Sequence, residues 1–307
     1  MPVPPTAWIL VGPTGARKSA VAQFLAEREG WDILSADSML IYRGMDIGTD
    51  KPSAEDRRKV RYWGLDLAAP NETFSVGKFL ETARESFQKA APGRLVVAGG
   101  TGLYVKCLVE GLDAAPPVDP ALREQLAGLD VAGLQEELRR RDPARLAGLA
   151  DPRNPRRLIR AIELAESKGR VPRAGRWPGP PMAGLRPEPV RWRTRLAERV
   201  KRMFESGLIE EARRLRDGCS SLSETARHAI GYAEALAVLD GQLTLEQAQD
   251  QAVRRTWQLA RRQMTWFRHQ ARVEWIDHDF SEPVADLAGK VRAAWRKHGP
   301  NPVVLPE

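Results

Sequence analysis

The 307-residue sequence has little of what marks secreted, metal-clustered or membrane-spanning proteins. Its two cysteines, Cys107 and Cys219, lie far apart and outside any CxxC pair, so neither a disulfide framework nor a cysteine zinc site is supported. No stretch approaches the roughly eighteen uncharged apolar residues of a membrane span, and residues 1–6 lack the basic start of a signal peptide. We therefore expect a cytoplasmic protein without a membrane segment.

The composition is that of a folded, basic protein. Apolar residues make up 42% and charged residues 29%, and the mean hydropathy of −0.43 is in the range of globular domains. The formal net charge is +8, and most cations are arginines, whose guanidinium groups suit bidentate contacts to phosphate. A polyanionic partner is expected. A GC-rich genome would explain the preference for arginine over lysine, but not the excess of cations.

Short apolar runs alternate with helix-length segments in the first third of the chain. Runs at 7–11, 31–34 and 95–98 each end in glycine or polar residues, and a helical pattern covers Lys18 to Arg28. This alternation predicts an α/β fold with a parallel sheet covered by helices. Because ligands gather at the carboxyl ends of such strands, we expect the three polar clusters to share one site.

Two stretches rich in proline and glycine divide the chain. Asp113 to Pro120 and Gly169 to Pro189 are typical of linkers, and the segment between them is patterned as helix. After Arg191 the pattern is again almost entirely helical, with one helix running through Thr256 to Phe267. We predict a first part of the α/β core over 1–117, a helical insertion over 118–189, and a helical C-terminal part over 190–307 that completes the core. The tail from Pro300 is expected to be loose.

The segment Gly12-Pro13-Thr14-Gly15-Ala16-Arg17-Lys18-Ser19 stands between the first strand and the first helix. There, backbone N–H groups can cradle a phosphate, Lys18 adds a positive charge, and the Ser19 hydroxyl can bind Mg²⁺. The formal pattern has glycine where Arg17 stands, and the alternative is a glycine turn that binds nothing. The loop predicts binding of a nucleotide such as ATP or of another phosphate. The 95–98 strand ends in Gly-Gly-Thr rather than Asp, which favours a kinase or an enzyme that releases pyrophosphate over a motor or switch.

Asp37 directly follows the second strand, across from the phosphate loop. A carboxylate there can take a proton from a nucleophile that attacks a bound phosphate ester, although a lone aspartate is equally often a helix N-cap. Thr101 follows the third strand and could cap its own helix or donate a hydrogen bond to the substrate. Asp37 is therefore the candidate general base.

Seven segments occur in an order typical of one enzyme family: GPTGARKS, DSMLIYRGMDIGTDKP, FSVGKFLETA, VVAGGTGLYVKCLVEGL, NPRRLIRAIE, HAIGYAEAL and RRQMTWFR. Together, over about Trp8 to Asp277, they resemble the tRNA dimethylallyltransferase family, also called tRNA isopentenyltransferase. The resemblance implies a core similar to P-loop NTPases, with a helical insertion that grips the anticodon stem and loop. It implies transfer of a dimethylallyl group from dimethylallyl pyrophosphate to N6 of adenosine 37 in tRNAs that read UNN codons, with release of pyrophosphate. Mg²⁺ is the implied cofactor, and we expect a monomer.

The resemblance also implies roles for individual residues. Asp37 would be the base for the adenine amine, and Thr101 would hydrogen-bond at the reacting centre. The pyrophosphate would bind to Gly12, Pro13, Thr14, Gly15, Ala16, Arg17, Lys18, Ser19 and Arg227, with Mg²⁺ on Ser19. The tRNA would contact Asp37, Ser38, Met39, Leu40, Thr101, Arg123, Arg156, Arg157, Leu158, Ile159 and Arg160.

An enzyme that modifies the exocyclic amine of an adenine within tRNA needs a surface that binds RNA, as well as a catalytic site. The adenine must leave its stack to reach the base and the electrophilic carbon, at a cost of a few kcal/mol that contacts to RNA must offset. A stretch with eight cations supplies such a surface: Arg153, Arg156, Arg157, Arg160, Lys168, Arg170, Arg173 and Arg176. A second basic group, Arg254, Arg255, Arg261, Arg262 and Arg268, is interleaved with Trp257, Trp266 and Phe267, which could stack on bases or form the inner face of a core helix.

The sequence departs from the family pattern at three places. Arg17 replaces glycine, Tyr62-Trp63 stands where two histidines are common, and Ala233 replaces a lysine or arginine. Donor affinity is therefore expected to be weakened, with activity retained. Two alternatives remain: a small-molecule kinase, which needs no basic insertion, and an RNA-binding protein without catalytic activity.

Overall fold

A computed structural model describes residues 5–112, 119–166 and 179–306. The chain forms two compact units, one of Met1–Gly111 with Trp177–Glu307 and one of Leu112–Arg176. Each unit has its own hydrophobic core. The chain enters and leaves the smaller unit from the larger, so the smaller unit is an insertion.

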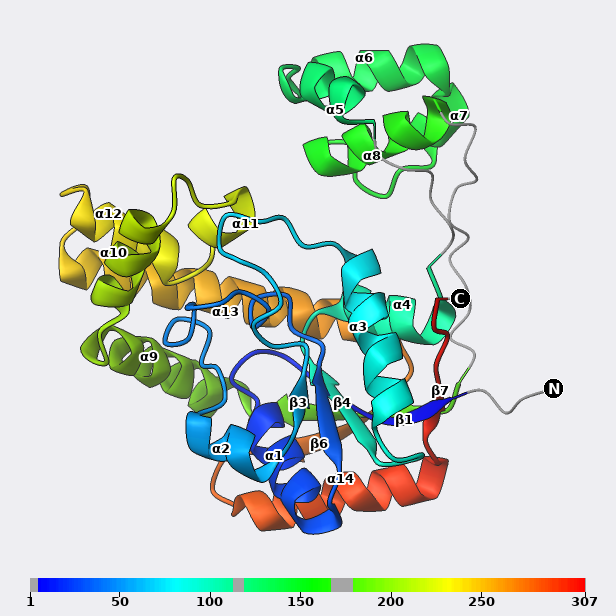
Figure 1. The fold of residues 1–307 in the computed structure, drawn as a ribbon, viewed down its shortest axis with the longest axis vertical. Helices are drawn as coiled ribbons and strands as arrows, with labels where there is room; N and C mark the ends of the chain where they lie inside the picture. The colour runs from blue at the N-terminus through cyan, green and yellow to red at the C-terminus, as the bar shows by residue number, and fades with distance from the viewer. Residues whose placement is uncertain (1–4, 113–118, 167–178, 307) are drawn as a thin grey trace. The chain divides into compact units, whose positions relative to one another are not determined.

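A mainly parallel sheet organises the larger unit (Figure 1). The strands are β1 (Thr6–Val11), β2 (Asp32–Ser35), β3 (Tyr62–Trp63), β4 (Leu95–Gly99), β5 (Met182–Pro187) and β6 (Val273–His278). They pair in parallel in the order β3-β2-β4-β1-β5-β6 within the described residues, and β7 (Asn301–Pro302) pairs antiparallel with β1. The predicted α/β class and the predicted strands at 7–11, 31–34 and 95–98 are confirmed.

Alternate residues of each central strand face opposite helical layers. Ile9 and Val11 of β1 pack towards α3 (Val76–Lys89) and α4 (Gly102–Glu110), whereas Leu10 packs towards α1 (Lys18–Glu29) and α14 (Val284–His298). Both layers bury large side chains completely, including Phe79 of α3. The near-continuous apolar strands of this sequence therefore reflect a sheet covered on both faces.

The C-terminal part adds a helical layer and the edge of the sheet. Its helices are α9 (Pro189–Glu205), α10 (Leu208–Gly218), α11 (Glu224–Arg227), α12 (Tyr232–Leu239) and α13 (Leu245–Gln270), and a short α2 (Ala54–Lys59) precedes β3. Phe204, Leu208, Tyr232 and Ala252 join one core with Ile41 and Tyr42, which lie shortly after Asp37. This helical layer thus supports the loop that follows β2.

Two expectations about the second half of the chain were wrong. Met182–Pro187 is strand β5, paired with β1 and β6, so the insertion does not reach residue 189. The C-terminal part is mostly helical, as predicted, and adds strand β6 (Val273–His278) to the sheet. The tail is not loose, because Ala7 pairs with Asn301, and Val303 is buried. Residues 113–118 and 169–178 of the predicted linkers lie outside the described residues.

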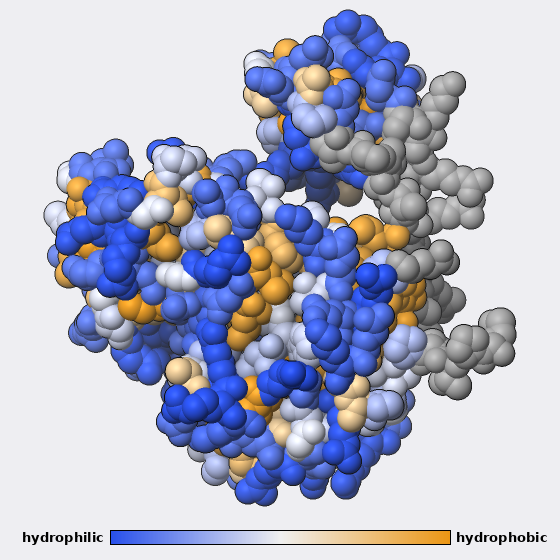
Figure 2. Space-filling model, in the orientation of Figure 1, coloured by the Kyte–Doolittle hydropathy of each residue, from blue (hydrophilic) through white to orange (hydrophobic). Residues whose placement is uncertain are grey.

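The smaller unit is a group of helices: α5 (Pro120–Ala127), α6 (Val131–Arg141), α7 (Pro143–Ala147) and α8 (Pro155–Glu166). Aspartates cap the first three, since Asp119, Asp130 and Asp142 each accept hydrogen bonds from the first turn. Leu134, Leu138 and Leu158 form its core. The side of this unit seen in Figure 2 is mostly hydrophilic.

Candidate active site

The loop between β1 and α1 has the backbone of a phosphate cradle. Gly12 and Gly15 adopt φ angles of 146° and 74°, which L side chains rarely adopt. A Cβ on Gly12 would lie 2.8 Å from the carbonyl oxygen of Leu185 in β5, so glycine is needed there for close approach to the sheet. Gly12 and Pro13 shape the loop, and the residues from Thr14 onward line a cavity.

Arg17 keeps the conformation for which glycine is usual. Its φ of 64° and ψ of 14° are left-handed, which costs a non-glycine residue about 1–2 kcal/mol. Its guanidinium Nη1 donates to the carbonyl oxygen of Glu282, just before α14, at 2.8 Å. Arg17 therefore adopts a left-handed conformation despite its side chain, and that side chain ties the loop to the residues just before α14.

A cavity of about 190 Å³ brings the first two predicted clusters together. Among the predicted residues, it is lined by Thr14, Gly15, Ala16, Arg17, Lys18, Ser19, Asp37 and Leu40. Ala98 and Gly99 at the end of β4 also line it, so the ends of three strands meet here. Ser35 lines it too, and its buried hydroxyl oxygen has no hydrogen-bond partner among the described residues.

Lys18 is the cation of this cavity. Its Nζ donates to the carbonyl oxygen of Pro13 at 2.6 Å. Burial lowers the pKa of Lys18 to about 8, opposed by the negative charge of Asp37 and reinforced by the positive charge of Arg199. The ammonium is thus poorly compensated in the free protein, and a bound polyanion would stabilise its charged form.

Three residues that sequence reasoning missed hold Thr14 of the loop in place. Arg199 of α9 donates to Thr14 Oγ1 at 2.8 Å, Trp192 of α9 donates to its carbonyl oxygen at 3.0 Å, and Gln263 of α13 accepts from its N–H at 2.8 Å. Gln263 also donates to the carbonyl oxygen of Gly100 at 3.0 Å, which joins the loop to the end of β4. Of these three residues, only Gln263 lies in a segment that the sequence analysis identified, RRQMTWFR. Arg199 could not be distinguished from the other arginines of its amphipathic helix.

Asp37 and Thr101 belong to one hydrogen-bonded turn. Asp37 Oδ1 accepts from the N–H of Met39 at 2.9 Å, and no helix follows, so Asp37 caps a turn rather than a helix. Thr101 Oγ1 accepts from the N–H of Ser38 at 3.0 Å and does not cap α4. One carboxylate oxygen of Asp37 is fixed by this turn, which orients the other for chemistry.

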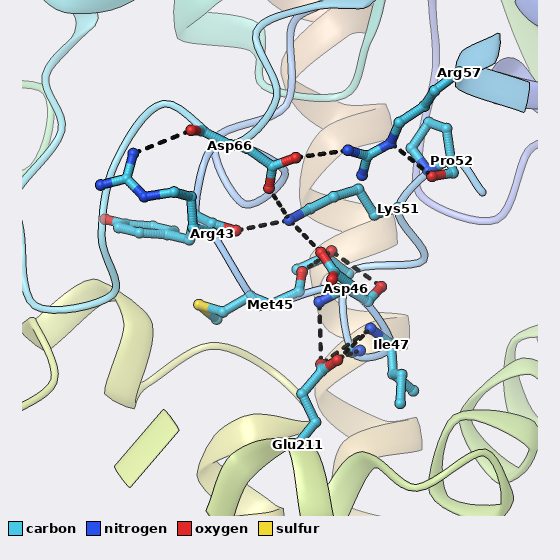
Figure 3. A network of polar contacts seen from close by, with 12 residues as sticks. Arg43, Met45, Asp46, Ile47, Lys51, Pro52, Arg57, Asp66 and Glu211 are labelled. Carbon is cyan, nitrogen blue, oxygen red and sulfur yellow. Dashed lines mark hydrogen bonds and ion pairs between the residues drawn. The ribbon is translucent and has the colours of Figure 1, made fainter. Parts of the chain in front are cut away.

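An ion network centred on the buried Lys51 holds the loop after Asp37 (Figure 3). The Lys51 side chain is only 1% exposed and lies 2.6 Å from Asp46 and 2.8 Å from Asp66. Burial acts to raise the pKa of Asp66, but hydrogen bonds from Lys51 and Arg57 outweigh it and hold that pKa below its usual range. The loop between β2 and α2 is therefore fixed from within.

Glu211 of α10 fixes the same loop from outside. Its carboxylate accepts from the N–H groups of Asp46, Ile47 and Gly48 at 3.0–3.4 Å (Figure 3). A Cβ on Gly48 would lie 2.4 Å from the Tyr232 ring, so this close approach requires glycine. The helical layer thus sets the position of the segment that carries Asp37.

The remaining predicted residues lie elsewhere. Arg227 is exposed on α11 and does not line the cavity, so the structure does not bring it to the predicted pyrophosphate site; Arg199 is the arginine found there. Arg123 and Arg160 of the smaller unit share Glu163, at 2.8 Å each. Arg156 and Arg157 are exposed.

Leu158 does not fit its predicted contact with RNA. It is completely buried among the helices of the smaller unit, and Ile159 packs partly against the same core. Their apolar spacing on α8 reflects packing rather than recognition. Arg153 is exposed, whereas Lys168, Arg170, Arg173 and Arg176 of the predicted surface lie outside the described residues.

The second basic group is divided between core and surface. Phe267 is completely buried and Trp266 packs against the core of the sheet, so these rings belong to the inner face of α13. Arg255 pairs with the buried Glu234 at 2.5 Å. Arg261, Arg262 and Arg268 are exposed.

Comparison with known proteins decides the family. A family model described as IPP transferase matches residues 40–270. The chain is 40% identical to a tRNA dimethylallyltransferase of Thermus thermophilus over 276 residues, covering 85% of this chain and 89% of the relative. The chain belongs to the IPP transferase family. The resemblance inferred from the order of the motifs and the assignment as a prenyltransferase are thereby confirmed.

Other relatives agree along most of the chain. A tRNA dimethylallyltransferase of Streptomyces coelicolor is 40% identical over 90% of this chain and 91% of its own length. The crystal structure of a tRNA isopentenylpyrophosphate transferase of Bacillus halodurans is 34% identical, with a TM-score of 0.67, and covers 95% of this chain and 97% of that one. These matches confirm the predicted core, which is similar to P-loop NTPases. No helix in the described ranges 5–112, 119–166 and 179–306 is long and apolar enough to cross a membrane.

Proposed function

We propose that this protein transfers a dimethylallyl group from dimethylallyl pyrophosphate to tRNA, on N6 of adenosine 37 in tRNAs that read UNN codons. Relatives at 40% identity are named tRNA dimethylallyltransferases, which supports the reaction class. The observation that carries the proposal is that Asp37, which follows β2, and Lys18, which begins α1 after β1, line one cavity.

The positively charged part of this cavity suits pyrophosphate, which is the leaving group of the reaction. Lys18 lies at the start of α1, and Arg199 and the N–H groups of the first turn add further positive charge. As the bond between the allylic carbon and the pyrophosphate oxygen breaks, charge accumulates on pyrophosphate. These groups stabilise that charge without reorganising, which is the largest contribution an enzyme site of this kind offers.

The carboxylate side suits the nucleophile. The exocyclic amine of adenine is weakly nucleophilic because its lone pair is delocalised into the ring. As the new bond between N6 and the allylic carbon forms, the proton on N6 moves to the free oxygen of Asp37, whose other oxygen is held by Met39. Thr101 and Ser38 do not line the cavity; they are joined by hydrogen bonds next to Asp37, so we assign them to positioning the turn that carries this base.

The oxygen donors of the cavity fit Mg²⁺. Ser19, Ser35 and Asp37 line it, and Ser35 Oγ has no partner in the part of the chain that the structure describes. No group of three or more His, Cys, Asp or Glu residues suited to a metal occurs among the described residues, so the ion would take most ligands from pyrophosphate and water. Ser19 would hold it, and bound Mg²⁺ would neutralise charge on the leaving pyrophosphate.

The RNA-binding surface is assigned to the smaller unit. Arg153, Arg156 and Arg157 are exposed there, and Arg123 and Arg160 share a single buried carboxylate, so their paired positive charge exceeds the negative charge they face. Such a surface suits the phosphates of an anticodon stem. It would also hold the anticodon loop while adenosine 37 is unstacked.

Product analysis tests the proposal. The protein is incubated with dimethylallyl pyrophosphate, Mg²⁺ and an unmodified tRNA that reads UNN codons. The tRNA is then digested to nucleosides, whose masses are measured by mass spectrometry. We expect adenosine carrying a five-carbon adduct, with one pyrophosphate released per adduct. Phosphoryl transfer from ATP without this adduct would support the kinase alternative, and tRNA binding without either product would indicate a non-catalytic RNA-binding protein.

A further inference from the structure

Asp50 and Arg199 form an ion pair in the wall of the phosphate cavity. Asp50 stands in the loop between β2 and α2, and its Oδ2 lies 3.0 Å from Nε of Arg199 on α9. Both residues line the cavity of Lys18 and Asp37, and both also line a second cavity of about 600 Å³. The pair therefore stands where the two cavities adjoin, and the reaction proposed above gives the Asp50 carboxylate no role.

Arg199 is held at two of its nitrogens and has a third to offer. Its Nη1 donates to Thr14 Oγ1 at 2.8 Å, and its Nε donates to Asp50. Its Nη2 makes no hydrogen bond to any residue in the part of the chain that the structure describes. Burial lowers the pKa of Lys18, and the positive charge of Arg199 adds to that effect, so the two cations act on the same small space. An anion bound there would meet both.

The backbone holds Asp50 in one place. Its φ of 57° is in the left-handed region, where a residue with a side chain persists only if its surroundings fix it. Its N–H donates to the carbonyl oxygen of Ile47 at 3.1 Å, and the next residue, Lys51, is the buried centre of the ion network in Figure 3. The Asp50 carboxylate is therefore carried on a turn that is fixed on both sides.

This carboxylate reduces the attraction of the cavity for an anion in two ways. It neutralises part of the charge of Arg199, and it places a negative charge of its own in the cavity wall. Solvent screens it, because the Asp50 side chain is 66% exposed, whereas that of Arg199 is 19% exposed. Pyrophosphate carries several negative charges, so even a screened carboxylate changes its affinity severalfold.

We propose that Asp50 sets the affinity of the phosphate cavity as a built-in counter-ion, with which bound pyrophosphate competes for Arg199. The inference rests on the proposed function, because pyrophosphate is the leaving group of that reaction. Without Asp50, the full charge of Arg199 would favour retention of the product. With it, Lys18 and the loop N–H groups carry more of the binding, and the product is held less tightly.

Calorimetric titration of the full chain with pyrophosphate and Mg²⁺ at pH 7.0, where Lys18 is charged, tests this proposal. Asp50→Asn removes the negative charge and keeps an oxygen that can accept from Arg199. Asp50→Gly also removes the charge and suits the left-handed backbone. We expect both variants to bind pyrophosphate about fivefold tighter than wild type, with a gain that shrinks as the salt concentration rises.

Asp240→Asn is the matched control. Asp240 also pairs with an arginine, Arg216, at 3.3 Å, but neither residue lines the phosphate cavity. This substitution removes the same charge from a comparable ion pair, so it should leave the affinity for pyrophosphate unchanged. The same gain in this variant would overturn the proposal, because it would reflect net charge alone.

The direction of the change separates a counter-ion from a structural support. If Asp50 only held Arg199 in place, both variants would bind pyrophosphate more weakly, and Asp50→Gly most of all. Equal or weaker binding by the two folded variants would therefore overturn the proposal, as would an undiminished gain from Asp50→Asn in an Arg199→Ala background. Thermal melts establish that each variant is folded. The titration needs no transfer to tRNA, so its failure is distinguishable from failure to form the adenosine adduct.

Discussion

At the scale of single residues, Lys18 gives the phosphate site a pH dependence. Because the pKa of Lys18 is lowered to about 8, its ammonium loses its proton as the pH rises through that value in the free protein. We expect the affinity for pyrophosphate to fall about tenfold per pH unit above about 8, because binding requires the charged form. Titrations from pH 6.5 to 9.5 measure this decline.

The Lys18→Arg protein is the control for this prediction. Arginine stays charged throughout the range, so the ratio of the two affinities removes the titration of pyrophosphate itself. A ratio that does not change with pH would show that Lys18 is not the titrating group.

Asp37 is the second residue whose role is open to test. Asp37→Ala and Asp37→Asn should each lower single-turnover transfer by about 10² or more, because both remove the general base. Affinity for tRNA should change little, most clearly for Asp37→Asn, whose amide oxygen can still accept from the N–H of Met39. An equal loss of binding and rate in the asparagine variant would show that Asp37 binds RNA rather than accepting a proton.

At the scale of elements, α10 positions the loop between β2 and α2 through one carboxylate. Glu211 is buried and accepts from three successive N–H groups. Glu211→Ala leaves these donors without partners, so we expect the free energy of unfolding to fall by about 3 kcal/mol, with faster amide exchange over 46–48. Denaturant unfolding measures the loss, and Arg213→Ala, exposed on the same helix, should stay within about 0.5 kcal/mol of wild type. Unchanged exchange in the Glu211 variant would contradict this positioning role.

Among the elements, three strands could be predicted from the sequence and two could not. Strands β1, β2 and β4 are apolar runs buried on both faces, and each ends in a polar cluster, so both the strands and their shared site were predictable. Strand β6, VEWIDH, mixes polar and apolar residues without strict alternation, lies at the sheet edge and is mostly half-buried, and β5 follows directly on proline and glycine residues. Neither carries a local pattern strong enough to separate it from its surroundings.

Residues that act through long-range contacts could not be predicted from the sequence either. Gln263 meets Thr14 across 249 residues of sequence, and Arg199 meets it across 185. Neither partner is visible until the sheet and the helical layer are assembled. Conversely, Leu158 was predicted to contact RNA because the 156–160 segment resembles a tRNA-contacting stretch of the family, whereas its side chain is buried by helix packing.

At the scale of the whole molecule, the two units carry different features that the proposed reaction needs. The larger unit holds a cavity with a cation, a carboxylate and an unsatisfied hydroxyl, and the smaller unit carries exposed arginines on a separate core. A kinase for small molecules would need only the first of these. Both are needed if a nucleobase within a folded RNA must be bound, unstacked and modified.

The most direct test of this account compares two tRNA transcripts that read UNN codons and differ only at position 37. Each is incubated with dimethylallyl pyrophosphate carrying a radioactive label in the allylic carbons, and label on RNA is counted after one turnover. The account predicts label on the transcript with adenosine 37 and none on the transcript with guanosine 37. Equal labelling of both transcripts, or labelling of neither while both bind, would contradict it.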